Sequence, residues 1–538
     1  MTGVYYPYMA SIVGKRRGKQ TYYYLVESAR VGGKPRIVSQ QYLGSAEEVL
    51  AKLTQTPGGQ PIRSQHKRFG DLAAVWSTLR RLDVVGIVDE VVPRYANAAA
   101  SVGTYLALAC ANRIVDACSK REFADWWATT AGPRWVKLGR AALDHRRFWD
   151  AMDRLGETEL REIETRLGRA MVSEFGLDLT GLALDMTNFA TFIDTGNQRA
   201  PIAQRGKAKQ KRTDLRLVGL ALVVTRYRDL VEGVESLTVV YDAGQNSTDN
   251  HQVVEKHVIG FVGSLPPSDH PELLAIPERA YRPVDPERYP GLRYVDTTVT
   301  ALGVTRRAVL THSENLAAKQ SRGLDQTLAK ARRRLAELAA RLARGHTRRP
   351  RDQVEAEIAA ICKPRWVSDI ITVTLTGKTP AQLRLTWRTD TAARARLEQR
   401  LFGKRILFTN RDWPVSDIVA AYRSQSDAEF GFRQLKDPHV VSFSPMHHWT
   451  DSKIRVHVFY CVLALAVAHL MRRHAQQGGL HLSVRELLDQ LAGIEETVLL
   501  YHEGSKGRPR VQRILTDMTP TQRKLADLFD IHQYAPTR

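Results

Sequence analysis

The sequence predicts an α+β protein of several domains, on three observations. Its 538 residues are more than one ordinary hydrophobic core holds. Hydrophobic residues make up 43% of the chain and charged residues 25%, a balance typical of folded, soluble proteins. Stretches with the apolar spacing of helices are interspersed with short β-branched runs between turns. The net charge of +22 indicates a polyanionic partner, most simply nucleic acid, and a merely solvated basic surface is the alternative.

The first third of the chain predicts a sheet followed by helices. Residues 1–55 are expected to form a small basic N-terminal β-sheet, because two apolar runs flank the turn sequence VGGK. Its basic side chains lie beside tyrosines, which fits a DNA contact as well as a capping sheet with a charged outer face. Residues 54–68 are predicted to be a polar linker. Residues 70–175 have helical spacing and predict a helical domain.

A strand pattern begins at residue 176. The runs 181–194, 215–227 and 236–242 are apolar, β-branched and bounded by polar turns, so each predicts a strand. Between the first two runs lies a basic segment, 197–214. These runs indicate that an α/β core begins here.

The remaining chain predicts three further segments. Residues 263–400 mix strands with helices, including a long helix near 314–345 whose exposed face is strongly basic. Residues 401–475 combine a strand with two helices, and residues 476–538 form a C-terminal region. The apolar run 458–471 is shorter than the roughly 20 residues of a membrane span, so a buried core helix is expected there.

The cysteines and the N-terminus carry no signal for export. None of the four cysteines forms a CxxC pair or has the spacing of a zinc site. Reduced, buried thiols of a cytosolic protein are therefore expected. The N-terminal residues lack a continuous apolar stretch, so no signal peptide is predicted.

Two aspartates stand at unusual places in the predicted strands. Asp185 interrupts the apolar run LALDMTNF, and Asp242 ends the run LTVVYD. A carboxylate there is costly unless it is paired or binds a metal, although a lone aspartate at a strand end is more often a turn residue. If the two strands are parallel neighbours, the carboxylates lie side by side. With Glu429 on a helix above them, they would suit two Mg²⁺ or Mn²⁺ ions for phosphodiester cleavage.

The stretch AYRSQSDAEFGFRQLK, residues 421–436, is predicted to form one helix with a polar stripe. A seven-residue step drifts only about 20° around a helix. The stripe contains Tyr422, Gln425, Glu429, Arg433 and Lys436. Phe430 and Leu435 lie off the stripe and are expected to anchor the helix to the core. Beside a metal-binding Glu429, such a face is suited to holding DNA phosphates and bases, whereas without the aspartates an ordinary salt-bridged helix would be favoured.

These residues resemble the DDE transposases of bacterial insertion sequences, in the insertion-sequence-four-like group. That group has the signature Tyr-x2-Arg-x3-Glu-x6-Lys, which here is Tyr422-x2-Gln425-x3-Glu429-x6-Lys436, with Gln425 in place of the arginine. The resemblance runs from the N-terminal sheet to about residue 475. It includes the segments DMTNF, YDAGQNSTDN, LFGKRILFTN, EFGFRQLKD and HHWTDSKIRVHVFY.

The resemblance implies an RNase H-like, retroviral-integrase-like α/β core in two parts, 176–262 and 401–475. A β-rich insertion domain over 263–400 would separate them, and the helical domain over 70–175 would bind DNA ends. Asp185, Asp242 and Glu429 would then be the catalytic metal ligands for Mg²⁺ or Mn²⁺. The expected DNA contacts are Tyr422, Gln425, Arg433, Lys436, Arg205, Lys211 and Arg212.

The implied reaction is cleavage at the terminal inverted repeats of an element, in many relatives through a hairpin, and strand transfer to target DNA. A homodimer on double-stranded DNA in the bacterial cytoplasm, associated with the nucleoid and not with a membrane, is expected. The sequence departs from the pattern between residues 227 and 236, where a third strand and most of a helix are missing, so an internal deletion that impairs activity is expected. The alternatives are a degenerate copy that binds DNA ends without catalysis, and an RNase H-like nuclease.

Overall fold

The computed structural model describes most of the chain, in two units defined by their internal contacts. The described residues are 9–18, 20–31, 34–49, 61–177, 181–184, 186–191, 194, 197–205, 216–221, 237–256, 259–345, 349–444, 446–501 and 510–537. Unit 1 comprises Met1–Arg81, Arg94–Ala151 and Ala466–Arg538, and unit 2 comprises Leu82–Pro93 and Met152–Leu465. The predicted helical segment 70–175 is therefore divided between the two units.

Unit 1 begins with the predicted basic sheet. It consists of the antiparallel strands β1 (Met9–Arg17), β2 (Gln20–Val31) and β3 (Lys34–Ser45), in that order. Val31 pairs with Lys34 across the VGGK turn, which confirms the hairpin. Val26 is buried, but side chains such as Ile12 and Ile37 are each 52% exposed, so the sheet has little core of its own.

The rest of unit 1 is mainly helical. Its elements include α2 (Gly70–Arg81), α4 (Val102–Val115), α5 (Phe123–Ala128), α18 (Val484–Ala492) and α19 (Pro520–Leu528). A second small sheet has the order β18 (Arg510–Leu515), β17 (Glu495–Tyr501), β4 (Pro61–Arg68). Part of the predicted linker is thus a strand, because β4 pairs with β17. The fully buried Glu496 is held by Arg134 and by Arg513, whose Nη1 lies 2.7 Å from Glu496 Oε1.

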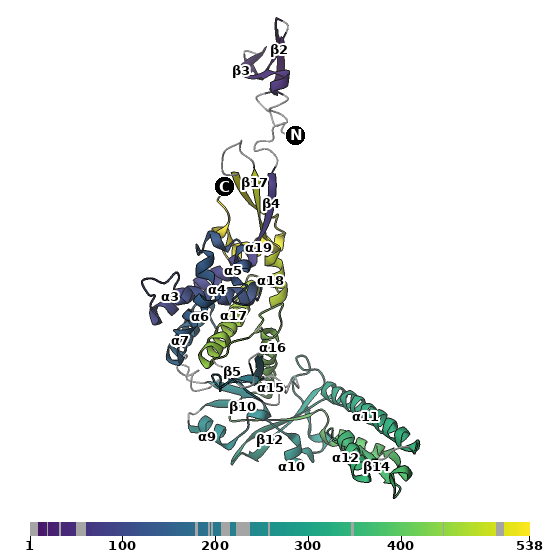
Figure 1. Ribbon diagram of the computed structural model, residues 1–538. Coiled ribbons are helices and arrows are strands. Elements are labelled where there is room, and N and C mark those ends of the chain that lie inside the picture. The colour runs from purple at the N-terminus through teal and green to yellow at the C-terminus, as the bar shows by residue number, and fades with distance from the viewer. Residues whose placement is uncertain are drawn as a thin grey trace. The chain divides into compact units, whose positions relative to one another are not determined.

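Unit 2 is built on a mixed seven-stranded sheet (Figure 1). The strand order is β11 (Arg282–Pro283), β12 (Leu292–Ala301), β13 (Val304–Ser313), β16 (Lys404–Thr409), β10 (Gly260–Leu265), β9 (Thr238–Tyr241), β5 (Gly181–Leu184). The strands β5, β9 and β10 are parallel to one another, and the other pairs are antiparallel. The α+β class predicted from the sequence is therefore confirmed.

Alternate residues of the central strands pack into two separate clusters, one on each face of the sheet, as the period of two in a strand requires. One cluster joins Val239, Tyr241, Phe261 and Phe408 to α9 (Thr248–Lys256) and α10 (Pro271–Leu274). The other joins Val240, Val262, Leu407, Ile418 and Tyr422, of which the last two belong to α15 (Val415–Arg423). The sheet is thus covered by helices on both faces (Figure 1).

The predicted strand 181–194 is two strands in two sheets. β5 ends at Leu184, and β6 (Met186–Thr191) pairs instead with β8 (Arg216–Ala221), which also pairs with β7 (Gln204–Arg205). β8 corresponds to the predicted strand 215–227 and does not belong to the seven-stranded sheet. The expected deletion between residues 227 and 236 lies outside the described residues.

The predicted insertion, 263–400, is only partly a separate structure. Its first strands, β12 and β13, extend the seven-stranded sheet through β16. The later part has its own hydrophobic cluster. This part consists of α11 (Glu314–Ala343), α12 (Arg351–Cys362), α13 (Val367–Ile370), β14 (Ile371–Thr376), β15 (Arg384–Thr389) and α14 (Thr391–Leu401).

Other helices complete the described chain. They are α3 (Val84–Val91), α6 (His145–Asp153), α7 (Glu157–Phe175), α16 (Gln425–Leu435) and α17 (Asp451–Gln477). Within the part of the chain that is described, α17 alone is long and apolar enough to cross a membrane. Of its most apolar window, 61% is buried inside the structure, as in a core helix, so it is weak support for a membrane span.

Candidate active site around Asp242

The strands β5 and β9 end at the same edge of the sheet, and in the sequence each is followed by one of the two aspartates singled out above. They pair in parallel, with Leu184 opposite Tyr241. In the sequence Asp185 follows Leu184 directly, and Asp242 follows Tyr241. The condition stated above, that the two strands are parallel neighbours, is therefore met. Asp185 itself lies outside the described residues, so the structure does not test its position as a ligand.

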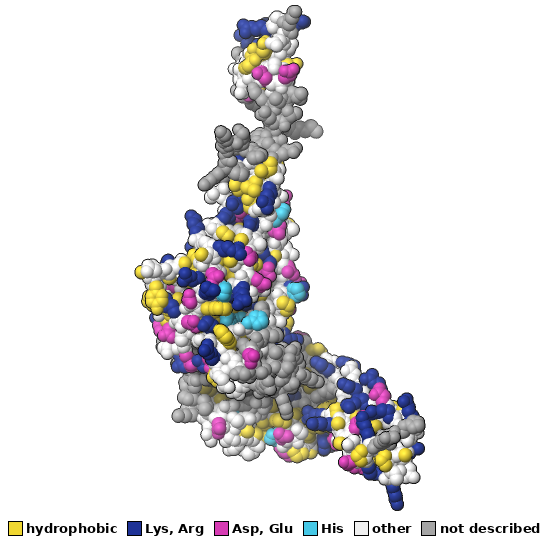
Figure 2. Space-filling model, viewed as in Figure 1, with side chains coloured by type: hydrophobic (Ala, Val, Ile, Leu, Met, Phe, Trp, Pro, Cys, Tyr) yellow, Lys and Arg dark blue, Asp and Glu magenta, His cyan; other side chains and the backbone are white. Residues whose placement is uncertain are grey.

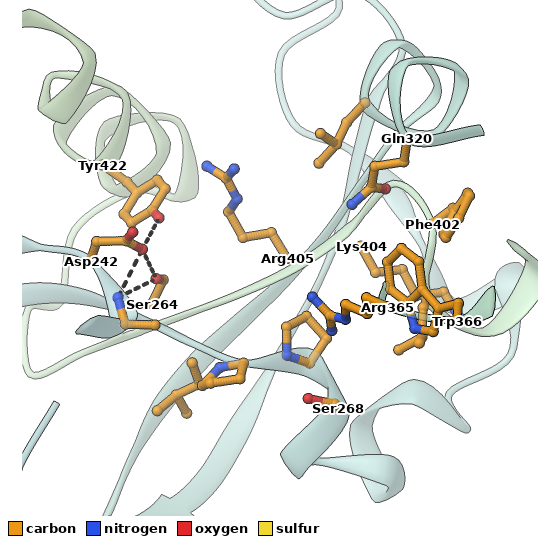
Figure 3. Close-up of a pocket in the computed structure, with 16 residues that line it drawn as sticks. Asp242, Ser264, Ser268, Gln320, Arg365, Trp366, Phe402, Lys404, Arg405 and Tyr422 are labelled. Atoms are coloured by element: carbon orange, nitrogen blue, oxygen red, sulfur yellow. Dashed lines mark hydrogen bonds between the residues drawn. The ribbon is translucent and has the colours of Figure 1, made fainter. Parts of the chain in front are cut away.

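Asp242 has one carboxylate oxygen fixed by three donors (Figure 3). Its Oδ1 accepts hydrogen bonds from the Ala243 backbone N–H at 2.8 Å, the Ser264 hydroxyl at 2.9 Å and the Tyr422 hydroxyl at 3.2 Å. Its Oδ2 has no hydrogen-bond donor among the described residues, and the residue as a whole is exposed. The carboxylate is thus oriented by one oxygen and open at the other.

These contacts also set the charge of Asp242. Burial raises the pKa of its carboxyl group, but the hydrogen bonds from Ala243, Ser264 and Tyr422, together with the positive charge of Arg405, outweigh burial and hold that pKa below its usual value. Asp242 is therefore ionised at neutral pH. An ionised carboxylate with a free oxygen is suited to bind a cation.

Tyr422 belongs to the core and to the site at once. Its side chain is 7% exposed in the cluster beneath α15. The Arg405 guanidinium carbon lies 4.9 Å from the centre of its ring, within the range of a cation–π contact. Burial raises the pKa of the Tyr422 hydroxyl, so it stays protonated and donates to Asp242. The structure places this hydroxyl against the carboxylate, and the contact with DNA expected at this position stays a prediction.

Close packing beside Asp242 requires a glycine at position 263. A Cβ atom there would lie 2.6 Å from Phe408 Cε1 and 2.8 Å from Tyr241 Cε2, distances that Cβ atoms essentially never show. Gly263 precedes Ser264 in β10, so this close approach helps place the Ser264 hydroxyl beside Asp242. Ser264 and Gly263 were not singled out in the sequence, because only the pairing of β10 with β9 and β16 brings them to the site.

The predicted single helix over 421–436 is two helices that break at Ser424. Tyr422 lies on α15, and Glu429 lies on α16. The continuous stripe is therefore wrong as predicted, although α16 contacts β5, the strand that precedes Asp185. Glu429 is exposed and has no ion pair among the described residues, so its carboxylate is available to a ligand.

The other members of the expected stripe differ in their surroundings. Arg433 is exposed, with its guanidinium 5.4 Å from the ring of Phe430, and Lys436 is the C-terminal cap of α16. Leu435 is 1% exposed and anchors the helix, as predicted, but Phe430 is 43% exposed and does not. The side-chain nitrogen of Gln425 is buried without a hydrogen-bond partner in the described structure.

A cavity of about 220 Å³ opens beside Asp242 (Figure 3). Three cationic side chains line it: Arg365, Lys404 and Arg405. Desolvation by burial lowers the pKa of the Lys404 ammonium from its usual value. In Figure 3 the Arg405 guanidinium points toward the Tyr422 side of the cavity. Three cations grouped in one cavity form a site for an anion such as phosphate.

No separate signal along the sequence indicates this cavity. Lys404 and Arg405 belong to the quoted segment LFGKRILFTN, but they come together with Arg365 only because the loop before α13 lies beside β16. Such a grouping depends on tertiary structure, which spacing along the chain does not encode.

The described residues alone do not complete a metal site. No group of three His, Cys, Asp or Glu side chains among them is close enough to hold a metal ion. Asp242 still offers a free, ionised oxygen, which is the hard ligand that Mg²⁺ and Mn²⁺ prefer. Of the expected DNA contacts, Lys211 and Arg212 lie outside the described residues, as does the side chain of Arg205. No protein-family model matches the chain, and a search of curated proteins finds no match.

Proposed function

We propose that this protein is a DDE-type DNA transposase of the insertion-sequence-four-like group, with an RNase H-like core. The single observation that carries the proposal is the parallel register of β5 and β9, with Leu184 opposite Tyr241. In the sequence Asp185 and Asp242 follow these two residues directly, after two strands that end at the same edge of the sheet. The order of the parallel strands β5, β9 and β10 is further support.

The carboxylates of Asp185, Asp242 and Glu429 are the groups that would hold Mg²⁺ or Mn²⁺. Such ions, when bound, activate a water molecule and stabilise the charge that develops on phosphate. The hydrogen bonds to Asp242 Oδ1 fix the orientation of its free oxygen. Contact between α16 and β5 supports Glu429 as the third carboxylate.

The basic cavity would hold the phosphate backbone of the DNA end beside these carboxylates. Arg365 and Arg405 are exposed at its rim, and Lys404 is partly buried. Their charges would offset the repulsion between a phosphate and the carboxylates. The protein would act as a homodimer on paired terminal inverted repeats and on target DNA, in the bacterial cytoplasm.

The test is a cleavage assay with the full chain. Its substrate is duplex DNA from the two ends of the element that surrounds the coding region, incubated with Mg²⁺, with Mn²⁺ or with EDTA. Strand cleavage at the ends is expected with either metal and is expected to stop with EDTA. Asp242→Asn and Glu429→Gln are expected to abolish it. Asp249→Asn, which alters an exposed carboxylate on α9, is the matched control and is expected to cleave like the parent.

Two other outcomes would identify a different function. End binding by a folded parent protein that never cleaves, with either metal, would indicate a degenerate copy, and Gln425 in the place of an arginine favours that alternative. Cleavage of an RNA–DNA hybrid with no preference for the element ends would indicate an RNase H-like nuclease instead.

A further inference from the structure

The helix α11 has an exposed face that carries positive charge along its whole length. The residues are Lys319, Arg322, Lys330, Arg334 and Arg344, the last being the C-terminal cap, and all five are exposed. At 100° per residue, they lie within about 60° of Lys319 around the helix axis. These five residues are called the α11 basic stripe below.

The opposite face of α11 is buried. Its core residues are Leu324, Leu328, Ala331, Leu335, Leu338 and Leu342, each at most 3% exposed. They lie about 100 to 180° from Lys319 around the axis. The helix therefore has no apolar face left with which to enter a membrane surface, and its outward face is polar, with the α11 basic stripe beside Arg333, Glu337 and Arg341.

One acid lies on the same face as the stripe: Glu337 is 18 residues, or five full turns, from Lys319, and it pairs with Arg333. Between residues 314 and 401 the chain has 19 Lys and Arg but 9 Asp and Glu, a surplus of ten in a chain of net charge +22. The nearby acids are already paired with other arginines: Asp325 with Arg394, Glu337 with Arg333, and Glu357 with Arg341 and Arg349. No member of the stripe has an ion pair among the described residues.

The arrangement of the stripe fits the backbone of a duplex. From Lys319 to Arg344 the helix rises about 37 Å at 1.5 Å per residue, the length of about 11 base pairs. Residues 314–343 include no aromatic side chain, so the face offers no platform on which unpaired bases stack. Figure 2 shows Lys and Arg side chains gathered over the region of α11 and α12.

We infer that the α11 basic stripe is a sequence-independent binding surface for duplex DNA. This inference rests on the proposed function and adds to it a second contact, along the helix whose first turns line the cavity beside Asp242 through Leu316 and Gln320. The stripe neutralises phosphates without reading bases, because it consists of flexible, unpaired cations on one regular helix. Its role is to hold the duplex that continues beyond the bases at the catalytic carboxylates.

The test measures binding without chemistry. The full chain is titrated onto a fluorescein-labelled 30-base-pair duplex of random sequence, in EDTA, at NaCl concentrations from 50 to 200 mM. The stripe variant carries Arg322→Gln, Lys330→Gln and Arg344→Gln. The matched control carries Arg279→Gln, Arg282→Gln and Lys378→Gln, three equally exposed cations of the same unit that also have no ion pair among the described residues.

For the stripe variant, the slope of log affinity against log salt concentration is expected to be smaller in magnitude by about two to three. Each of the three lost phosphate contacts contributes roughly 0.9 to this slope. The control is expected to match the parent, and all three proteins are expected to unfold at the same temperature. A stripe variant that binds like the parent would overturn the inference, as would an equal loss in the control. If the stripe variant lost binding to an acidic polypeptide such as polyglutamate but kept its binding to the duplex, the surface would be assigned to a protein partner. That result would overturn the inference as well.

This outcome is separable from that of the cleavage assay. If cleavage of the element ends never occurs but the stripe variant loses duplex binding, the proposed function fails and the duplex-binding surface remains. If cleavage occurs but the stripe variant binds and cleaves like the parent, the proposed function stands and this inference fails.

Discussion

The Tyr422 hydroxyl donates a hydrogen bond of 3.2 Å to Asp242 Oδ1, across 180 residues of sequence. The bond joins the C-terminal end of α15 to the residue that follows β9. Because Tyr422 is also buried beneath α15, its position is fixed by packing and the hydroxyl is held in place. The tyrosine is therefore suited to orient the carboxylate, which is a different role from the DNA contact that the sequence predicted.

Tyr422→Phe removes this hydrogen bond and keeps the ring. A hydrogen bond to a charged group contributes about 1.5 kcal/mol at the low end of its range, which corresponds to about a tenfold change in rate. The turnover rate of metal-dependent cleavage is expected to fall about tenfold, with the KM for DNA unchanged. Steady-state cleavage of the element ends at a series of DNA concentrations measures both. A raised KM with an unchanged rate would show that the tyrosine contacts DNA instead.

Ser264→Ala is expected to alter how stability depends on pH. The hydrogen bond from Ser264 is one of the contacts that hold the pKa of Asp242 below its usual value, against the opposing effect of burial. A carboxyl with a lowered folded-state pKa adds stability above its unfolded-state pKa, and this stability is lost as the pH falls through the folded-state pKa. The variant is therefore expected to lose about 1 kcal/mol of unfolding free energy at pH 7, discounted for the exposure of Asp242, and less at pH 3.

Urea unfolding at the two pH values measures this difference, and the background Asp242→Asn provides the control. With the carboxyl gone, Ser264→Ala is expected to cost the same at both pH values. An equal cost at pH 7 and pH 3 in the parent background would mean that the serine acts through packing and not through the charge of Asp242.

The sequence predicts the faces of the central strands but not their partners. A period of two shows that Val239 and Tyr241 share a face, and β-branched residues indicate a strand. Neither pattern reveals that 181–194 contains β5 and β6, which belong to two different sheets, because the apolar run continues from one strand into the other. From the sequence, the parallel pairing of β5 with β9 could be stated only as a condition for the two aspartates to lie side by side. The observed register shows that the two strands do pair in parallel.

The break between α15 and α16 had no signal in the sequence. The stretch AYRSQSDAEF contains neither glycine nor proline, so its residues favour a continuous helix. The buried ring of Tyr422 binds α15 to the sheet, whereas Phe430 on α16 remains exposed. Tertiary packing of this kind overrides local propensity, which is why the predicted stripe does not persist.

Gly263→Ala is expected to destabilise unit 2, since its Cβ atom would lie 2.6 Å from Phe408 Cε1. Phe408 is 1% exposed in the core, so neither it nor the backbone of β10 has room to move freely. Overpacking of this kind costs about 1 to 3 kcal/mol. Chemical denaturation of the purified protein measures the change. Gly244→Ala is the matched control, because no atom lies within 4 Å of the Cβ position there. Equal stability of the two variants would contradict the steric argument.

Gln425→Arg is expected to strengthen binding of the DNA end. The side-chain nitrogen of Gln425 is buried without a partner in the described structure, and an arginine there would supply the missing member of the signature together with a positive charge. One added phosphate contact is expected to steepen the dependence of log affinity on log salt by about 0.9. Fluorescence anisotropy with the end duplex, in EDTA, measures it.

Ser426→Arg is the matched control, because Ser426 is exposed on the same helix, one residue further along. An added charge alone would strengthen binding equally in both variants, whereas a specific contact would favour Gln425→Arg. The Gln425→Arg variant also tests whether Gln425 is the reason for any lack of cleavage by the parent protein. If Gln425→Arg restores cleavage that the parent lacks, the glutamine is the cause of the loss. If binding improves and cleavage does not, the cause lies in another part of the chain.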